Sequence, residues 1–385
     1  MAKPRRKDRK KAGGSPRKAA RPKPEADDAV DPRRAWFVLA LLALPFVALL
    51  GWVGVQAVAV GQAETEIRAL GGTVRRYEQV GQLGRVSFEG KPITDDDLAR
   101  LRKALEAGGG PVELDLSGTK VTDAGLANLA GATNLVRLNL EGTGVTGPGL
   151  VHLKGMARGG VENSVELNLS RTGVDDTGLE SLRGLVDLSV LNLSDTKVRG
   201  PGLKALHGLS ELHDVSLAGC PVDDEGLVGL DGWPNLSVLG LARTQVTDAA
   251  LPRLRRLEGL ESLDLGGTKV TDAGLEALAG WKSLTALSLA DTAVTSSGLR
   301  RLRANNPLVH LNLSGTSVSD QDLIDLNGWP TLRSLSLERT AITDAGLLRL
   351  ADLPELDRLW LRGSKFTPAG LTALQQRKPK VLADY

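Results

Sequence analysis

The 385-residue sequence predicts an α/β solenoid, and three observations lead to that fold class. A threonine returns at steps of 24 residues over most of the chain. In most repeats it stands in the frame Leu-x-x-Leu-x-Leu-x-x-Thr. Aromatic residues make up only 3% of the chain, which suits stacked layers of small aliphatic side chains better than a single compact core. A fixed period of this length is typical of a chain built from repeated strand–helix units.

Eleven repeats are predicted over residues 111–370, with one strand and one helix in each. The Leu-x-Leu pair has the period of two that indicates a short strand. The segment after the turn, such as Thr122 to Leu129, reads as a short helix with leucine at i and i+3. We therefore expect a right-handed solenoid with short parallel strands on its concave side and short helices on its convex side. The repeats begin near Val112, Leu135, Val165, Leu188, Leu212, Leu236, Leu260, Leu284, Leu308, Leu332 and Leu356.

The returning threonine is interpreted as a structural ladder. It stands where the chain leaves the strand, so nearby backbone groups lose their partners in the sheet. A short hydroxyl can bond those groups and link one turn to the next. Cys220 fills one slot as a small packed residue, with a reactive thiol as the alternative, and Ser364 fills the last. The ladder is Thr119, Thr143, Thr172, Thr196, Cys220, Thr244, Thr268, Thr292, Thr316 and Thr340.

One repeat shows the whole register: Leu260-x-x-Leu263-x-Leu265-x-x-Thr268-x-Val270-Thr271-Asp272-Ala273-Gly274-Leu275. It resembles the leucine-rich repeats of the ribonuclease-inhibitor-like and F-box-associated type. It is also similar to bacterial membrane-anchored proteins with Thr-Asp-Ala-Gly-Leu repeats. The resemblance covers about 112–380 and implies a leucine-rich-repeat fold. The chain departs from it in having Thr in place of Cys and no recognisable F-box, which argues against a ubiquitin-ligase adaptor.

The N-terminal part has a different composition. Residues 1–34 contain 13 Lys/Arg and 5 Asp/Glu and few large apolar groups, so we expect a disordered basic cytoplasmic tail. Nucleic-acid binding is the alternative for that tail, but no nucleic acid is expected as a partner. Residues 35–60 carry no charge and would reach about 39 Å as a helix, enough to cross a membrane.

The predicted topology follows from the two segments together. A transmembrane signal-anchor helix over 35–60, flanked by Lys and Arg at its N-terminal end, keeps the N-terminus cytoplasmic and the repeats extracytoplasmic. A cleaved signal peptide ending near Ala57-Val58-Ala59 is the competing interpretation. Residues 62–110 are expected to form a juxtamembrane and N-terminal capping module that includes a short helix over 64–70. Residues 371–385 are expected to form a C-terminal cap.

The ends of the concave face carry the candidate binding residues. The middle of the face is small and neutral, whereas both ends carry charge. At the C-terminal end a tryptophan stands between two arginines, residue types that are enriched at binding hot spots. The candidates are Arg358, Trp360 and Arg362 as the first choice, and Glu113, Asp115, Arg137 and Glu166 at the other end.

Two further features are open to a binding role. A five-residue insertion within 155–164 makes the single break in the 24-residue step, and insertions in repeat proteins form loops that sometimes bind. Trp233, Trp281 and Trp329 recur every 48 residues. Each replaces an apolar residue that closes a repeat, so packing is the first interpretation and an aromatic binding row is the alternative.

No catalytic, cofactor-binding or metal-binding motif is present, and we expect a protein that is not an enzyme. The four histidines lack the spacing of metal ligands, and the recurring Asp123, Asp248, Asp272 and Asp344 fit helix capping better than a calcium site. The sequence predicts a membrane-anchored binding protein that recognises a protein or envelope polymer outside the cytoplasm through its concave face. A structural or adhesive spacer and an intracellular adaptor of F-box-like repeat type are the alternatives.

Overall fold

The computed structural model describes most of the chain. The described residues are 32–76, 82–107, 110–156, 164–302 and 307–385. Contacts divide the chain into two units, Met1–Trp52 and Val53–Tyr385. All of the strands lie in the second unit, and the account of the fold concerns that unit.

The strands form one 14-stranded sheet in the order of the sequence. The first strand is antiparallel to the second, and every later pair is parallel. The short parallel strands predicted at each Leu-x-Leu pair are therefore confirmed. The bounds are β1 Thr73–Arg75, β2 Gly84–Ser87, β3 Val112–Asp115, β4 Leu135–Asn139, β5 Val165–Asn168, β6 Leu188–Asn192, β7 Asp214–Ser216, β8 Val238–Gly240, β9 Ser262–Asp264, β10 Ala286–Ser288, β11 His310–Asn312, β12 Ser334–Ser336, β13 Arg358–Trp360 and β14 Leu382–Asp384.

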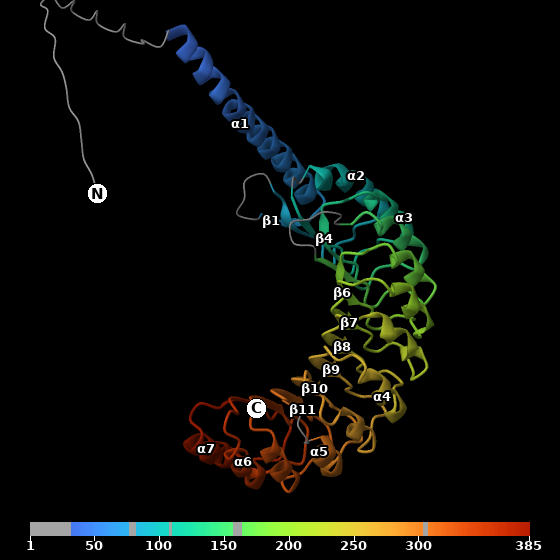
Figure 1. The fold of residues 1–385 in the computed structure, drawn as a ribbon, viewed down its shortest axis with the longest axis vertical. Helices are drawn as coiled ribbons and strands as arrows, with labels where there is room; N and C mark the ends of the chain where they lie inside the picture. The colour runs from blue at the N-terminus through green and yellow to red at the C-terminus, as the bar shows by residue number, and fades with distance from the viewer. Residues whose placement is uncertain (1–31, 77–81, 108–109, 157–163, 303–306) are drawn as a thin grey trace, which may run out of the picture. The chain divides into compact units, whose positions relative to one another are not determined.

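The helices of the repeats lie on the side of the chain opposite the strands (Figure 1). Many of them are 3₁₀ rather than α helices, because each must turn back within a few residues to reach the next strand. The α-helices are α1 Pro32–Ala69, α2 Asp95–Glu106, α3 Asp123–Leu126, α4 Leu251–Leu254, α5 Ser296–Leu302, α6 Asp344–Leu350 and α7 Pro368–Arg377. The 3₁₀ helices are η1 Ala127–Leu129, η2 Pro148–Leu153, η3 Gly178–Leu182, η4 Pro201–Leu206, η5 Gly226–Gly232, η6 Asp248–Ala250, η7 Gly274–Leu278 and η8 Asp322–Gly328.

The membrane span predicted over 35–60 is not found. Those residues fall within helix α1. In the part of the chain that the structure describes, no helix combines the length and the apolar character that a membrane crossing requires. The tail predicted over 1–34 lies outside the described residues except for its last three.

The N-terminal end of the solenoid is covered by the last turns of α1. The helix predicted over 64–70 is the end of this longer helix, and Gly71, with φ of 82°, follows its last turn. Val60, Ala63 and Ile67 share one face of α1 and are at most 5% exposed. They join the same buried cluster as Phe88, so the first turn of the solenoid does not expose its apolar interior.

The core is a stack of leucines in register. Leu260, Leu263 and Leu265 are each at most 1% exposed, and Leu263 pairs with Leu287 of the next repeat. Each buried leucine contributes about 2 kcal/mol through the hydrophobic effect, so the stack is the main source of stability.

The tryptophan row belongs to this core. Trp233, Trp281 and Trp329 are 1%, 4% and 0% exposed. The packing interpretation is therefore confirmed, and the aromatic binding row is wrong, because a side chain buried to this extent offers no surface to a partner. The insertion within 155–164 lies mostly outside the described residues, since 157–163 are not described.

Carboxylates clamp successive repeats together on the helix side. The side chain of Asp248 accepts hydrogen bonds from the backbone N–H of Thr271 at 2.7 Å and from its hydroxyl at 2.6 Å. Thr271 in turn accepts from Ala273 N–H at the start of its own helical turn. The sequence predicted only a local capping role for these aspartates, and that was incomplete. The clamping carboxylates are Asp95, Asp123, Asp176, Asp224, Asp248, Asp272, Asp320 and Asp344.

The glycine of the Thr-Asp-Ala-Gly-Leu motif leaves room for the clamp. A Cβ atom at Gly274 would lie 2.3 Å from an oxygen of Asp248. Ala250 holds the same place in another repeat, opposite Asp224. There the bonds from Thr247 to Asp224 are still 2.8 and 2.6 Å long. Glycine therefore avoids a close contact with the clamping aspartate at this position. The repeat with Ala250 nevertheless keeps its clamp in the presence of a methyl group.

The threonine ladder bonds the backbone within each repeat and joins neighbouring repeats at two places. The hydroxyl of Thr268 donates to the carbonyl oxygen of Leu265, three residues earlier, at 2.6 Å, and the other ladder threonines do the same in their own turns. The expected bond to the backbone is confirmed. The expected link between turns is found at Thr196, whose hydroxyl lies 3.3 Å from the Cys220 thiol, and at Thr340, whose hydroxyl lies 3.3 Å from that of Ser364. Cys220 and Ser364 differ, since each donates to a leucine carbonyl of the preceding repeat.

A second set of contacts spans two repeats. The residue before each ladder position has the left-handed backbone conformation, with a positive φ. It is glycine in some repeats and a charged residue in others. Arg243 pairs with Asp195 at 3.3 Å, and Arg339 pairs with Asp291 at 2.9 Å, each across an intervening repeat. The repeat between carries Gly315 in the second case, where a Cβ would lie 2.0 Å from an Asp291 oxygen. Each bridge thus needs a glycine at its centre.

We predict that Asp272→Ala destabilises the chain by about 2 kcal/mol, because the N–H and hydroxyl of Thr295 lose a charged acceptor. Asp352→Ala is the matched control: it removes an exposed carboxylate whose ion pair with Arg377 contributes little. Urea denaturation of the full chain followed by circular dichroism measures both. Equal midpoints for the two variants would contradict a role for the clamp.

Candidate binding face

The candidate surface is the strand face, defined as the outward-facing side chains of β2 to β13. The leucine or valine between each outward pair points into the core, so two side chains per strand face away from the helices. Two hollows indent this face. The first has a volume of about 440 Å³ and lies over β2 to β6. The second has a volume of about 510 Å³ and lies over β9 to β13.

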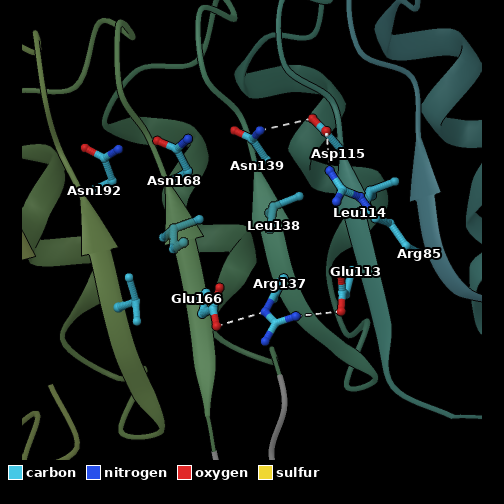
Figure 2. Close-up of a pocket in the computed structure, with 12 residues that line it drawn as sticks. Arg85, Glu113, Leu114, Asp115, Arg137, Leu138, Asn139, Glu166, Asn168 and Asn192 are labelled. Atoms are coloured by element: carbon cyan, nitrogen blue, oxygen red, sulfur yellow. Dashed lines mark hydrogen bonds and ion pairs between the residues drawn. The ribbon is translucent and has the colours of Figure 1, made fainter. Parts of the chain in front are cut away.

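The first hollow holds the N-terminal candidates, and they are paired with one another (Figure 2). Arg137 lies between two carboxylates, 2.6 Å from Glu113 and 2.8 Å from Glu166. The three residues come from adjacent strands β3, β4 and β5 at matching register positions. Because the charges are satisfied within the protein, they are less available to a partner than the sequence alone indicates.

Asp115 is committed to the protein as well. It is 6% exposed and accepts hydrogen bonds from the side chain of Asn139 at 3.1 Å and from the hydroxyl of Ser117 at 2.7 Å. Arg85 of β2 adds an ion pair at 3.3 Å. Asn168 and Asn192 occupy the equivalent places on the next strands, and each accepts from the backbone N–H two residues later. This row closes the turns after the strands, a structural role that the sequence analysis did not assign.

The second hollow is lined mainly by small polar side chains. Its floor comes from the leucines of β9 to β11, and one end is formed by the half-buried ring of Trp360. The exposed ring of His310 and the half-buried carboxylate of Glu338 also line it. Among the described residues, neither of these two side chains forms a hydrogen bond or ion pair. The sequence places both on the concave face through their outward slots in the repeat frame, but neither was among the candidate binding residues.

The first-choice candidates lie together at the C-terminal end. Arg358 and Trp360 are on β13, and Arg362 follows it in the next turn. Both arginines are exposed, and within the described part of the chain neither side chain has a hydrogen bond or ion pair. The structure does not bring them near the N-terminal candidates, because seven strands separate β5 from β13. The strand face thus has a self-neutralised end and an end with free side chains.

Cys220 lies in the core and away from the strand face. It is 1% exposed, and its thiol donates to the carbonyl of Leu193 at 3.0 Å. Burial raises the pKa of this thiol, so the neutral form persists at a pH where a free cysteine ionises. These contacts agree with the packing interpretation of this residue.

We predict that Arg137→Met costs about 1 kcal/mol of stability at low ionic strength, because Glu113 and Glu166 would both lose the guanidinium that lies between them. The loss should shrink in 1 M NaCl, where such repulsion is screened. Arg333→Met is the control, since its pair with Glu355 is more than half exposed on both sides. Denaturation midpoints at two salt concentrations test this. A loss that does not change with salt would point to packing instead.

We predict that iodoacetamide alkylates Cys220 in the native full chain far more slowly than in urea. The raised pKa lowers the fraction of reactive thiolate, and burial keeps the reagent away from the sulfur. The chain has one cysteine, so mass spectrometry reads the reaction directly. A Cys220→Ser, Ser210→Cys chain is the control, because residue 210 is exposed. Similar rates in the native and urea-treated wild type would contradict the burial.

The comparisons with known proteins agree with this fold. The family description "Leucine Rich repeat" matches residues 112–130, 165–182, 260–279 and 330–351. Among solved structures, an internalin from Listeria monocytogenes is 19% identical, with a TM-score of 0.54 and with 84% of this chain and 94% of that chain covered. At this identity the likeness shows the fold alone.

Two further solved structures are similar over less of their fold. A leucine-rich-repeat protein of Leptospira interrogans is 17% identical with a TM-score of 0.47, and 74% of each chain is covered. A TDR receptor is 16% identical with a TM-score of 0.44, and 78% of this chain and 51% of that chain are covered. No curated protein matches the sequence. The four matched segments are leucine-rich repeats, and the solenoid of parallel strands is a leucine-rich-repeat fold.

Proposed function

We propose that this chain is a binding scaffold that recognises a protein through its strand face. The second hollow carries the proposal. Small side chains open a groove of about 510 Å³, and the aromatic ring of Trp360 stands at its end. Trp360 and the free Arg358 and Arg362 beside it are of the two residue types that contribute most at protein interfaces. Protein binding is also the common use of such a repeat surface.

Three finer statements belong to the same proposal. We propose the ribonuclease-inhibitor-like subtype of repeat, on the register of Leu260 to Leu275. We propose that the repeats act outside the cytoplasm, because Lys/Arg-rich residues 1–34 followed by an uncharged stretch have the order of segments found in secretory signals. An envelope polymer is the second class of ligand. Protease added to intact and to lysed cells that produce the full chain tests the location. Repeats that resist the protease in intact cells and are digested only after lysis would overturn it.

We predict that a photo-crosslinking residue at Ser288, inside the second hollow, captures a discrete partner from cells that produce the full chain. The same residue at Leu348, which is 37% exposed on the helix side, is the matched control and should capture none. Mass spectrometry identifies the adduct. Trp360→Ala should reduce its yield at least several-fold, with thermal unfolding measured in parallel to confirm the fold.

The contrary outcomes are distinct. Adducts of equal yield from both faces would mean that the strand face is not selective. No adduct from Ser288 would overturn the binding proposal and favour the spacer role. An adduct that contains glycan in place of peptide would support the polymer.

A further inference from the structure

Asp214 occupies an unusual place on the strand face. It lies on β7, and its register partners are Val190 on β6 and Val238 on β8. Neighbouring strands are about 4.8 Å apart, so the carboxylate has an aliphatic side chain directly on each side. All three residues are half-buried. The position lies between the two hollows, beyond Val190 of the first and before Ser262 of the second.

The carboxylate of Asp214 has no partner in the described part of the chain. It accepts no hydrogen bond and forms no ion pair there. Other carboxylates of the face are held: Asp115 by Arg85 and Asn139, and Asp264 by the backbone N–H of Gly266 at 2.9 Å. Burial raises the pKa of Asp214, with the charge of Glu166 acting in the same direction and that of His213 opposing it. An anion placed between two valines without a donor is stabilised when a donor arrives.

The surface beside Asp214 is open. Gly240 stands diagonally across on β8, where a Cβ would lie 2.9 Å from the hydroxyl oxygen of Ser216. A larger side chain there would crowd the strand face, and glycine leaves it clear. An extended segment crossing from one hollow to the other can therefore pass over Asp214.

Charge and shape together define the ligand. A lysine side chain has four methylenes that pack on valines and an ammonium that donates to a carboxylate, and arginine offers the same combination with a guanidinium. A metal ion is a poor fit, because no group of three or more His, Cys, Asp or Glu side chains that could hold one occurs among the described residues. An anionic group does not fit either, since five outward carboxylates face two guanidinium groups between β2 and β9. These are Glu113, Asp115, Glu166, Asp214 and Asp264 against Arg85 and Arg137.

We propose that Val190, Asp214 and Val238 form a subsite for a lysine or arginine side chain of a polypeptide partner. The proposal rests on protein binding by the strand face and names the residue type that the face selects. The aliphatic stem of the incoming residue packs on the two valines, and its charged end donates to Asp214. The subsite sets where the partner's basic residue must lie relative to the second hollow.

Fluorescent octapeptides of alanine and serine, each with one central lysine, arginine, norleucine or glutamate, test the proposal against the full chain by fluorescence anisotropy. We expect the lysine and arginine peptides to bind at least about tenfold more tightly than the norleucine peptide, as one charge-assisted hydrogen bond implies. In Asp214→Asn this preference should disappear. Asp264→Asn is the matched control: it removes a charge from the same face yet keeps an oxygen for Gly266, so the preference should remain.

Every other result counts against the subsite. Binding without preference for a basic residue, a preference that survives Asp214→Asn, or no binding of any peptide would overturn it. Comparing the adducts from Ser288 in wild-type and Asp214→Asn chains separates the two proposals. An adduct that persists unchanged in Asp214→Asn leaves protein binding standing without the subsite. Loss of adducts from the wild type itself removes protein binding.

Discussion

The hydrogen-bonded clamp between an aspartate of one repeat and a threonine of the next is the interaction on which the regular geometry depends. The parallel sheet joins successive repeats on one side, and the leucine stack fills the interior. Without the clamp, side-chain packing and single backbone bonds, such as that from Lys269 N–H to the Val246 carbonyl at 2.9 Å, would fix the distance between repeats on the helix side. Because Asp248 reaches both the N–H and the hydroxyl of Thr271, it fixes the position and the direction of the incoming turn. A regular strand face follows from this fixed step.

Repeats that lack the clamp close their first turn locally. Gly147, Gly200 and Ser296 stand where an aspartate would be. In the repeat that follows Gly147, Asp175 accepts from Thr177 and Gly178 of its own turn, and the bond from the Thr177 hydroxyl lowers the pKa of that carboxyl. Asp322 accepts from Ser319 in the same way. Some repeats are thus capped by the preceding repeat and others within their own turn, while the sheet continues unbroken.

The sequence predicts the parts of this structure that are local. Leu263 and Leu265 mark a strand through spacing alone, and Trp281 is assigned to the core because it replaces a leucine. The role of Asp272 is not predictable in that way, since the threonine that it binds is 23 residues later. Charged residues at equivalent positions of the repeats also do not reveal from the sequence which of them form ion pairs in the structure. Arg137 and Arg358 look equivalent in the sequence, and only the strand register shows that the first is bound by two glutamates.

The ion pairs that bridge two repeats distinguish repeats that are otherwise alike. The left-handed positions read Asp195, Gly219, Arg243, Gly267, Asp291, Gly315 and Arg339. This order of charge returns only after four repeats, whereas the leucines return after one. In the native array, Asp195 pairs with Arg243 two repeats later. If one repeat were left out of the stack during folding, a glycine would take the place of Arg243, and if two repeats were left out, Asp291 would take that place. Such errors would leave the packing of the leucines intact, but they would remove the ion pair of Asp195 or place it beside a second aspartate. The pairs therefore favour correct order in an array whose core alone would accept several.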